Sequence, residues 1–154
     1  MTDRLWTVYL SGEIHTDWRE QIQKGAGAAG LPIEFVGPVT IHEDSDDCAV
    51  AILGEAPSDF WKDQMGTRVN AIRTRTLIDQ SDIAVIRFGD KYKQWNAAFD
   101  AGYCAAIGTP YITLHAEDVN HPLKEVDGAA QAVAREPAQV VKILKYVMTG
   151  VLER

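Results

Sequence analysis

The chain has 154 residues, 46% hydrophobic and 24% charged, which is the composition of one soluble globular domain spanning residues 1–154. A chain of this length buries roughly 70% of the surface of its unfolded form, so it needs neither disulfides nor a metal to hold a core. Its 15 basic and 22 acidic side chains give a net charge of −7, which argues against a nucleic-acid partner.

The cysteines and the apolar runs indicate the cellular setting. Cys48 and Cys104 form no C-x-x-C pair, and two thiols cannot enclose a structural zinc. The longest unbroken apolar run, residues 48–53, is too short to span a membrane, and the first residues lack the basic and apolar regions of a signal peptide. We therefore expect a cytoplasmic protein with no membrane span and no metal or redox cofactor.

Local patterns predict alternating elements from the beginning of the chain. The apolar stretch 5–10 is typical of a strand. Asp17 followed by Glu20 has capping-box spacing and predicts a helix over 17–29. Residues 33–36 then predict a second short strand.

The middle of the chain is less regular. Residues 40–47 are interpreted as an acidic loop, and residues 48–53 as either a strand or buried coil. Ser58 is expected to cap a long helix. One face of that helix carries an apolar stripe that we expect to be core, made of Trp61, Met65, Val69 and Ile72.

The second half alternates again. Patterns predict strands at 83–88, 111–114 and, weakly, 131–134, with helices from about Asn96 to Gly108 and from Pro137 to Gly150. Strands that alternate with helices predict an α/β fold: an open parallel sheet of about five strands with helices on both faces.

One glycine-rich string is misleading. Residues 25–30 match G-x-G-x-x-G, but they close a helix and precede a strand. A dinucleotide site requires the opposite order, so that the pyrophosphate meets a helix N-terminus. We interpret the string as a helix end.

The loops after the first and third strands, residues 11–16 and 89–96, are better candidates. In an open parallel sheet, ligands bind beyond the carboxyl ends of the strands where the strand order reverses. Gly12 either lets backbone amides approach an anion or a sugar or forms a plain turn. The second loop holds two lysines and two aromatic side chains, which suit a stacking platform or a merely exposed polar loop.

Three further side chains have two interpretations each. Asp100 lies near the beginning of a helix whose positive end favours an ionised carboxylate, as a nucleophile requires, although acidic residues there also simply stabilise helices. His15 and His115 follow the first and fourth strands. They are either ligand-contacting or general-acid groups on one rim, or ordinary polar rim residues.

Taken together, residues 8–12, 79–85 and 99–110 resemble the nucleoside 2-deoxyribosyltransferase superfamily, in particular its YtoQ-type branch. The branch-level similarity extends over residues 54–63 and 70–75. The resemblance implies a flavodoxin-like sheet of order 2-1-3-4-5 and cleavage of an N-glycosidic bond.

The resemblance also assigns site residues. The family's nucleophilic glutamate, which attacks the anomeric carbon, aligns with Asp100, and its Tyr-x-x-Gly opening at the sugar site aligns with Tyr9 and Gly12. Other residues of the two loops are expected to contact the substrate, namely Ser11, His15, Gln94, Trp95 and Asn96.

The chain departs from the family's pattern at several places, of which those at Asp100 and Gln94 affect the chemistry most directly. Asp100 is one methylene shorter than the usual nucleophile, so the reacting atoms must be brought closer by the backbone or the substrate. The family's second carboxylate aligns with Gln94, which leaves the departing base without its usual acid. Glu13, beside Gly12, either replaces that carboxylate or merely caps the helix.

The sequence therefore predicts an enzyme that transfers or hydrolyses the glycosyl group of a small-molecule nucleoside, nucleotide or related N-glycoside. The alternatives are a catalytically silent protein that binds a nucleotide in the same cleft and a protein whose sheet mainly builds an assembly. Because family relatives complete their sites with a neighbouring subunit, we expect a homo-oligomer with Trp61, Tyr92 and Trp95 near the contact.

Overall fold

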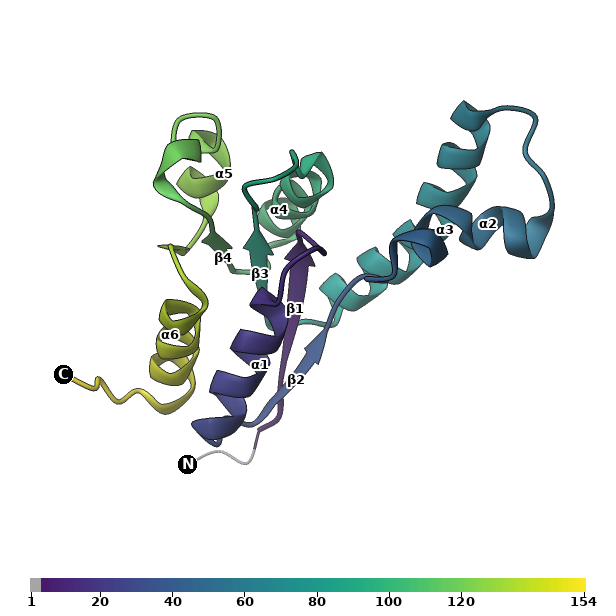
Figure 1. Cartoon of the computed structure of the whole chain (residues 1–154). Helices are drawn as coiled ribbons and strands as arrows, with labels where there is room; N and C mark the ends of the chain where they lie inside the picture. Colours follow the sequence, from purple (N-terminus) through teal and green to yellow (C-terminus); the bar gives the residue numbers. More distant parts are fainter. Residues whose placement is uncertain (1–3) are drawn as a thin grey trace.

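The computed structural model describes residues 4–154. Its five strands form one all-parallel sheet of order β2-β1-β3-β4-β5, as predicted (Figure 1). The strands are β1 (Trp6–Gly12), β2 (Ile33–Val36), β3 (Ile83–Arg87), β4 (Tyr111–Leu114) and β5 (Ala132–Ala134). The helices are α1 (Trp18–Ala28), α2 (His42–Leu53), α3 (Asp59–Asp79), α4 (Trp95–Ile107), α5 (Lys124–Ala129) and α6 (Pro137–Thr149), with a short 3₁₀ turn η1 (Glu117–Val119).

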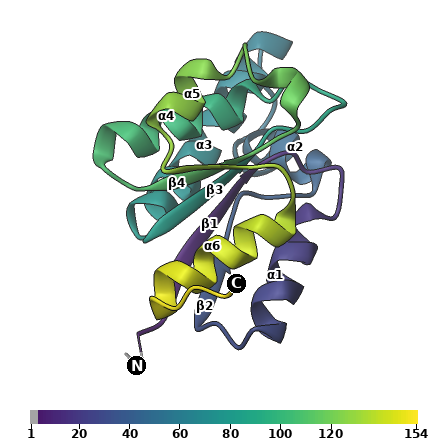
Figure 2. The ribbon, with the colours of Figure 1, turned by 90° about the vertical axis from the view of Figure 1, so that its left-hand side faces the viewer.

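Helices cover both faces of the sheet because successive strand side chains point to opposite sides (Figure 2). On β1, Val8 and Leu10 join the core beneath α1 and α6. Tyr9, between them, joins the other core, against α4 and the C-terminal end of α3. The same alternation places Ser11 on the side of Tyr9.

The end of β1 lies unusually close to β3. Gly12 pairs with Arg87, and its φ of +113° lies in a region that favours glycine. A Cβ atom at Gly12 would lie 2.1 Å from the carbonyl oxygen of Arg87. Only a glycine therefore lets β1 end here beside β3.

The acidic loop predicted for residues 40–47 is wrong, and so are both interpretations of residues 48–53. Residues 42–53 form α2, in which Glu43 and Asp44 occupy the first turn and interact favourably with the helix dipole. The helix packs along α3, where the Asn70 side chain donates a hydrogen bond to the Ser45 carbonyl at 3.0 Å and Lys62 pairs with Asp47 at 2.7 Å. A tertiary contact, invisible in the local pattern, makes this charged segment helical.

The apolar stripe of α3 is not core as predicted. Ser58 caps the helix, but Trp61 is 44% and Ile72 71% exposed. Figure 1 shows the reason: α2 and the first two thirds of α3 project away from the sheet. We call residues 42–72 the helical arm.

The remaining elements agree with the sequence within a few residues. The glycine-rich string closes α1, as interpreted, and its last residue, Gly30, has a positive φ. The sequence missed η1 and α5, which follow β4. The side chain of Asp17 makes no capping bond, so the predicted capping box at α1 is wrong.

Two glycine substitutions test the close approach of β1 and β3. We expect Gly12→Ala to lower the free energy of unfolding by roughly 2–4 kcal/mol, because it combines backbone strain with a clash. Gly27→Ala is the matched control. Gly27 lies in α1 with open space around its Cβ position, so alanine there should stabilise by about 0.4–1 kcal/mol. Urea denaturation of both variants measures the difference, and equal effects would contradict the packing argument.

Candidate functional site

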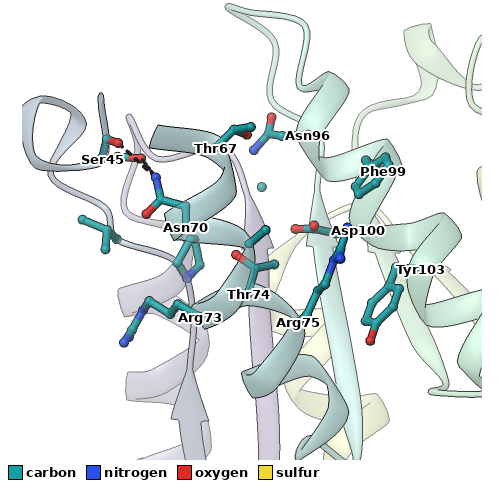
Figure 3. Close-up of a pocket in the computed structure, with 14 residues that line it drawn as sticks. Ser45, Thr67, Asn70, Arg73, Thr74, Arg75, Asn96, Phe99, Asp100 and Tyr103 are labelled. Carbon is teal, nitrogen blue, oxygen red and sulfur yellow. Dashed lines mark hydrogen bonds between the residues drawn. The ribbon is translucent and has the colours of Figure 1, made fainter. Parts of the chain in front are cut away.

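A cavity of about 390 Å³ lies at the carboxyl ends of β1 and β3, the point where the strand order reverses (Figure 3). The end of β1, the loop after β2 and helices α2, α3 and α4 line it, with Gly12, Pro38, Val39, Ser45, Thr67, Asn70, Ala71, Arg73, Thr74, Arg75, Asn96, Phe99, Asp100 and Tyr103. The cavity lies beside the end of β1, as expected, but α4 and α3 rather than the loop after β3 form its other walls.

Asp100 reaches the cavity from the second turn of α4 and is held there by β1. The Ser11 hydroxyl donates a hydrogen bond of 2.6 Å to Oδ2 of Asp100. Burial raises the pKa of Asp100 above its ordinary value, and the hydrogen bond from Ser11 opposes part of that rise. Burial, rather than the helix end that the sequence suggested, thus dominates the ionisation of this carboxyl.

Tyr9 lies beneath the same carboxyl. Its side chain is fully buried, and its hydroxyl forms no hydrogen bond to a residue in the described range 4–154. Burial, and then the charge of Asp100, raises the pKa of Tyr9 to about 12, partly offset by a side-chain interaction with the neighbouring Thr74 hydroxyl and by the positive charges of Arg19 and Arg73. A buried hydroxyl that stays protonated and lacks a partner is a hydrogen-bond donor available to a ligand or to a moving carboxylate.

Arg19 fixes the loop that carries Gly12. Its guanidinium is buried and donates to the carbonyl oxygens of Leu10 (3.1 Å), Gly12 (3.2 Å) and Glu13 (2.7 Å). These contacts hold the end of β1 and the residue after it against α1. The position of Ser11, and through it that of Asp100, depends on this clamp.

The carboxylate of Glu13 is hydrogen-bonded within its own turn. Glu13 is 4% exposed, and its carboxylate accepts hydrogen bonds from the backbone N–H of His15 and from the Thr16 hydroxyl. Gly89 leaves room for it, since a Cβ there would lie 2.5 Å from Cγ of Glu13. Glu13 lines an adjoining hollow rather than the cavity of Asp100.

That adjoining hollow, about 360 Å³, holds other predicted contact residues. His15 packs against Tyr92 with ring centroids 5.0 Å apart, and Gln94 accepts a hydrogen bond of 2.8 Å from the backbone N–H of Gly89. Asn96 lines both spaces. Trp95 is exposed and lines neither of them.

His115 does not join the cavity. It is fully buried at the end of β4, where Nε2 lies 2.9 Å from the carboxylate of Asp127 and Nδ1 lies 2.7 Å from the Ala116 carbonyl. Thr113 donates to the same carboxylate at 2.8 Å. This cluster ties β4 to α5.

The sequence interpretation of individual residues missed one wall of the cavity. Helix α3 supplies Thr67, Asn70, Arg73, Thr74 and Arg75 to it. The signal was the string 70–75, which carries the branch-level resemblance. It could be recognised as shared, but not as lining a site, because its position depends on where α3 crosses the sheet end.

The described residues contain neither a candidate metal-binding cluster nor a candidate membrane-spanning helix. Residues 4–154 contain no group of three or more His, Cys, Asp or Glu side chains placed to hold a metal ion. In the same range, no helix is both long and apolar enough to cross a membrane.

The fold and the site define the class first: a flavodoxin-like parallel α/β domain with a half-buried carboxylate at its topological switch point. Within that class, the chain belongs to the family described as nucleoside 2-deoxyribosyltransferase YtoQ, whose sequence model matches residues 9–148. It is 41% identical over 140 residues to the uncharacterized protein YtoQ of Bacillus subtilis (strain 168), which covers 91% of this chain and 95% of that protein.

Solved structures show the same fold at low sequence identity. A conserved protein from Enterococcus faecalis V583 superposes with a TM-score of 0.59 and 13% identity over 94% of this chain and 99% of that one. A 2-deoxyribosyltransferase from Bacillus psychrosaccharolyticus superposes with a TM-score of 0.55 and 15% identity, covering 88% and 90% of the two chains.

The hydrogen bond from Ser11 gives a test of the Asp100 environment that needs no substrate. It favours the charged carboxylate, so Ser11→Ala should raise the pKa of Asp100 further and move its titration to higher pH. Carbon-detected NMR of labelled aspartate follows this titration, with Asp100→Asn to assign the signal. Ser81→Ala, which removes a hydroxyl bonded to the Leu77 carbonyl, is the control and should leave the titration unmoved. A shift to lower pH in Ser11→Ala would refute the assignment.

Proposed function

We propose that the chain cleaves the N-glycosidic bond of a nucleoside, nucleotide or related N-glycoside, with Asp100 as the nucleophile. The observation that carries the proposal is a half-buried carboxylate, oriented by Ser11, that lines a cavity at the switch point of the sheet. A volume of about 390 Å³ is within the range of small-molecule sites. Membership of the YtoQ family supports the same substrate class.

The reaction has two halves. An oxygen of Asp100 forms a bond to the anomeric carbon as the carbon–nitrogen bond breaks, and the bonding electrons leave with the base, which takes up a proton. In the second half, water or the nitrogen of another base attacks the same carbon, loses a proton and restores the carboxylate. Water gives hydrolysis and a base gives transfer.

Ser11 and Tyr9 prepare Asp100 for this role. Attack requires reacting atoms about 3–3.5 Å apart, and aspartate reaches less far than glutamate. The Ser11 hydroxyl fixes one carboxylate oxygen. We assign the unpartnered Tyr9 hydroxyl as a donor to the sugar or to the carboxylate once it advances.

Glu13 is our candidate for the proton that the departing base needs. It adjoins Gly12 of the cavity, but both its oxygens accept hydrogen bonds from the turn. The Thr16 hydroxyl can rotate away, whereas the backbone N–H of His15 cannot. Glu13 therefore acts as an acid only by releasing Thr16.

One observation favours a second candidate function, binding without turnover. Among the described lining residues, Asp100 is the one carboxyl group of the cavity. Gln94, at the position of the family's second carboxylate, uses its carbonyl oxygen to hold the N–H of Gly89. A cleft that keeps the nucleophile but lacks a free acid would bind a nucleotide and leave it intact.

Chromatographic detection of free base, from a panel of nucleosides and nucleotides, decides between the two functions. We expect Asp100→Asn to lower turnover by at least a thousandfold with little loss of affinity, because the amide keeps the shape and loses the nucleophilic charge. Glu13→Gln should slow poor leaving groups more than activated ones. An equal loss for all leaving groups in Glu13→Gln would mean that Glu13 only stabilises its turn. Full turnover by Asp100→Asn would refute Asp100 as the nucleophile. No turnover by the parent chain would favour binding without catalysis.

We also propose that the chain is a homo-oligomer. The helical arm, residues 42–72, exposes large apolar side chains that the rest of the chain leaves uncovered, namely Ile52, Leu53, Phe60, Trp61 and Ile72. Tyr92, in the loop before α4, and Trp95, the first residue of α4, are also exposed. Exposed apolar surface on this scale is typical of interaction sites.

Light scattering at micromolar concentration tests the assembly. The parent chain should have at least twice the monomer mass of 17.0 kDa, and Trp61→Glu should shift it toward the monomer. Tyr146→Glu places the same charge on α6, at a similarly exposed aromatic residue, and should not change the mass. A monomeric parent chain would contradict the proposal.

A further inference from the structure

The charge of the cavity differs from that of the chain. The protein carries a net charge of −7, yet the described residues that line the cavity include two arginines, Arg73 and Arg75, and one acid, Asp100. The other polar lining groups are hydroxyls and amides. The cavity is therefore a locally cationic space in an acidic protein.

The two arginines lie differently. Arg73 donates a hydrogen bond of 3.2 Å to the carbonyl oxygen of Gly37, and Figure 3 shows its guanidinium pointing away from Asp100. Arg75 extends toward the Asp100 side of the cavity in the same view. Arg73 thus helps to hold the loop after β2, whereas the guanidinium of Arg75 is available to bind a ligand.

Arg75 has an obvious partner that it does not use. Asp79 lies four residues later on α3, a spacing at which opposite charges commonly pair. Asp79 instead accepts a hydrogen bond of 2.6 Å from the Tyr103 hydroxyl. Within residues 4–154, Arg75 forms no hydrogen bond and no ion pair.

Asp100 does not neutralise Arg75 either. No ion pair joins the two, and burial and Ser11, not a neighbouring cation, determine the direction of the Asp100 pKa shift. A guanidinium with five donors and no internal acceptor is well suited to a planar or tetrahedral oxyanion, which it can bind through two parallel hydrogen bonds. Asp100 and Arg75 are therefore not paired with each other, and each can contact a different part of a substrate.

We propose that the substrate is an anionic N-glycoside whose oxyanion, a phosphate or a carboxylate, is bound by Arg75. The proposal rests on the proposed function in that it concerns the same cavity, but it adds that neutral nucleosides are poor ligands. A phosphate would come from a nucleotide, and a carboxylate from an acidic base. Asp100 stays free of an internal ion pair until the substrate arrives.

Calorimetric binding to the full-length Asp100→Asn protein tests the proposal without turnover. The ligands are four 2′-deoxynucleosides, their 5′-monophosphates, and uridine with orotidine, which adds a carboxylate to the same base. We expect at least a tenfold tighter binding of the anionic member in at least one pair. Preference for the monophosphates identifies a phosphate, and preference for orotidine a carboxylate.

Charge variants then connect the preference to Arg75. In the same background, Arg75→Met should remove the preference for the anion while binding of the neutral member changes less than twofold, and Arg75→Lys should retain part of it. Lys24→Met is the control, because it removes one positive charge from the exposed side of α1, away from the cavity, and should retain the full preference.

The outcomes separate this inference from the proposed function. Base release by the parent chain without preference for an anion in any pair would overturn the inference and keep the function. Tight, Arg75-dependent binding of an anion without base release would keep the inference and overturn the function. Equal loss of preference in Arg75→Met and Lys24→Met, or binding of no ligand in the panel, would overturn the inference.

Discussion

The site depends on how closely β1 approaches β3 at Gly12. The contact with the Arg87 carbonyl leaves no room for a side chain, and the positive φ turns the chain away from the sheet. Arg19 then holds the carbonyls of Leu10, before that turn, and of Glu13, after it. Because β1 ends in this fixed position, Ser11 faces α4 and meets Asp100. A rigid sheet end therefore determines where a carboxylate on a neighbouring helix can be used.

Partial burial of the Asp100 carboxylate costs free energy when the group ionises, and this cost points to a functional role. A half-buried Asp100 is harder to ionise than a solvated one, and Ser11 offsets only part of this. A fold gains no stability from such a group at neutral pH, since its raised pKa favours the protonated form in the folded state. Carboxyl groups whose pKa is raised by burial are found preferentially at functional sites. Tyr9, buried without a partner beneath it, has the same character.

The helical arm contributes to the site in a different way. It supplies Thr67 and Asn70 to the α3 wall of the cavity, which continues beyond the arm to Arg75, while its outer part has little contact with the sheet (Figure 1). Only Ala49 of α2, and only Gly66 and Ile78 of α3, are buried. An element with so little internal packing is expected to gain order from what binds it, whether a ligand at its base or a second copy along its length.

Local patterns in the sequence determined the order of the elements, the parallel sheet and the two loops that meet at its carboxyl end, because hydrophobic periodicity and turn residues are properties of short segments. They also singled out Gly12 and Asp100. Only the tertiary structure decided that residues 40–53 are helical, that Trp61 is exposed, that Glu13 is engaged by its own turn and that Arg75 lacks a partner. Burial and pairing of side chains depend on which segments pack together, and no local pattern specifies that.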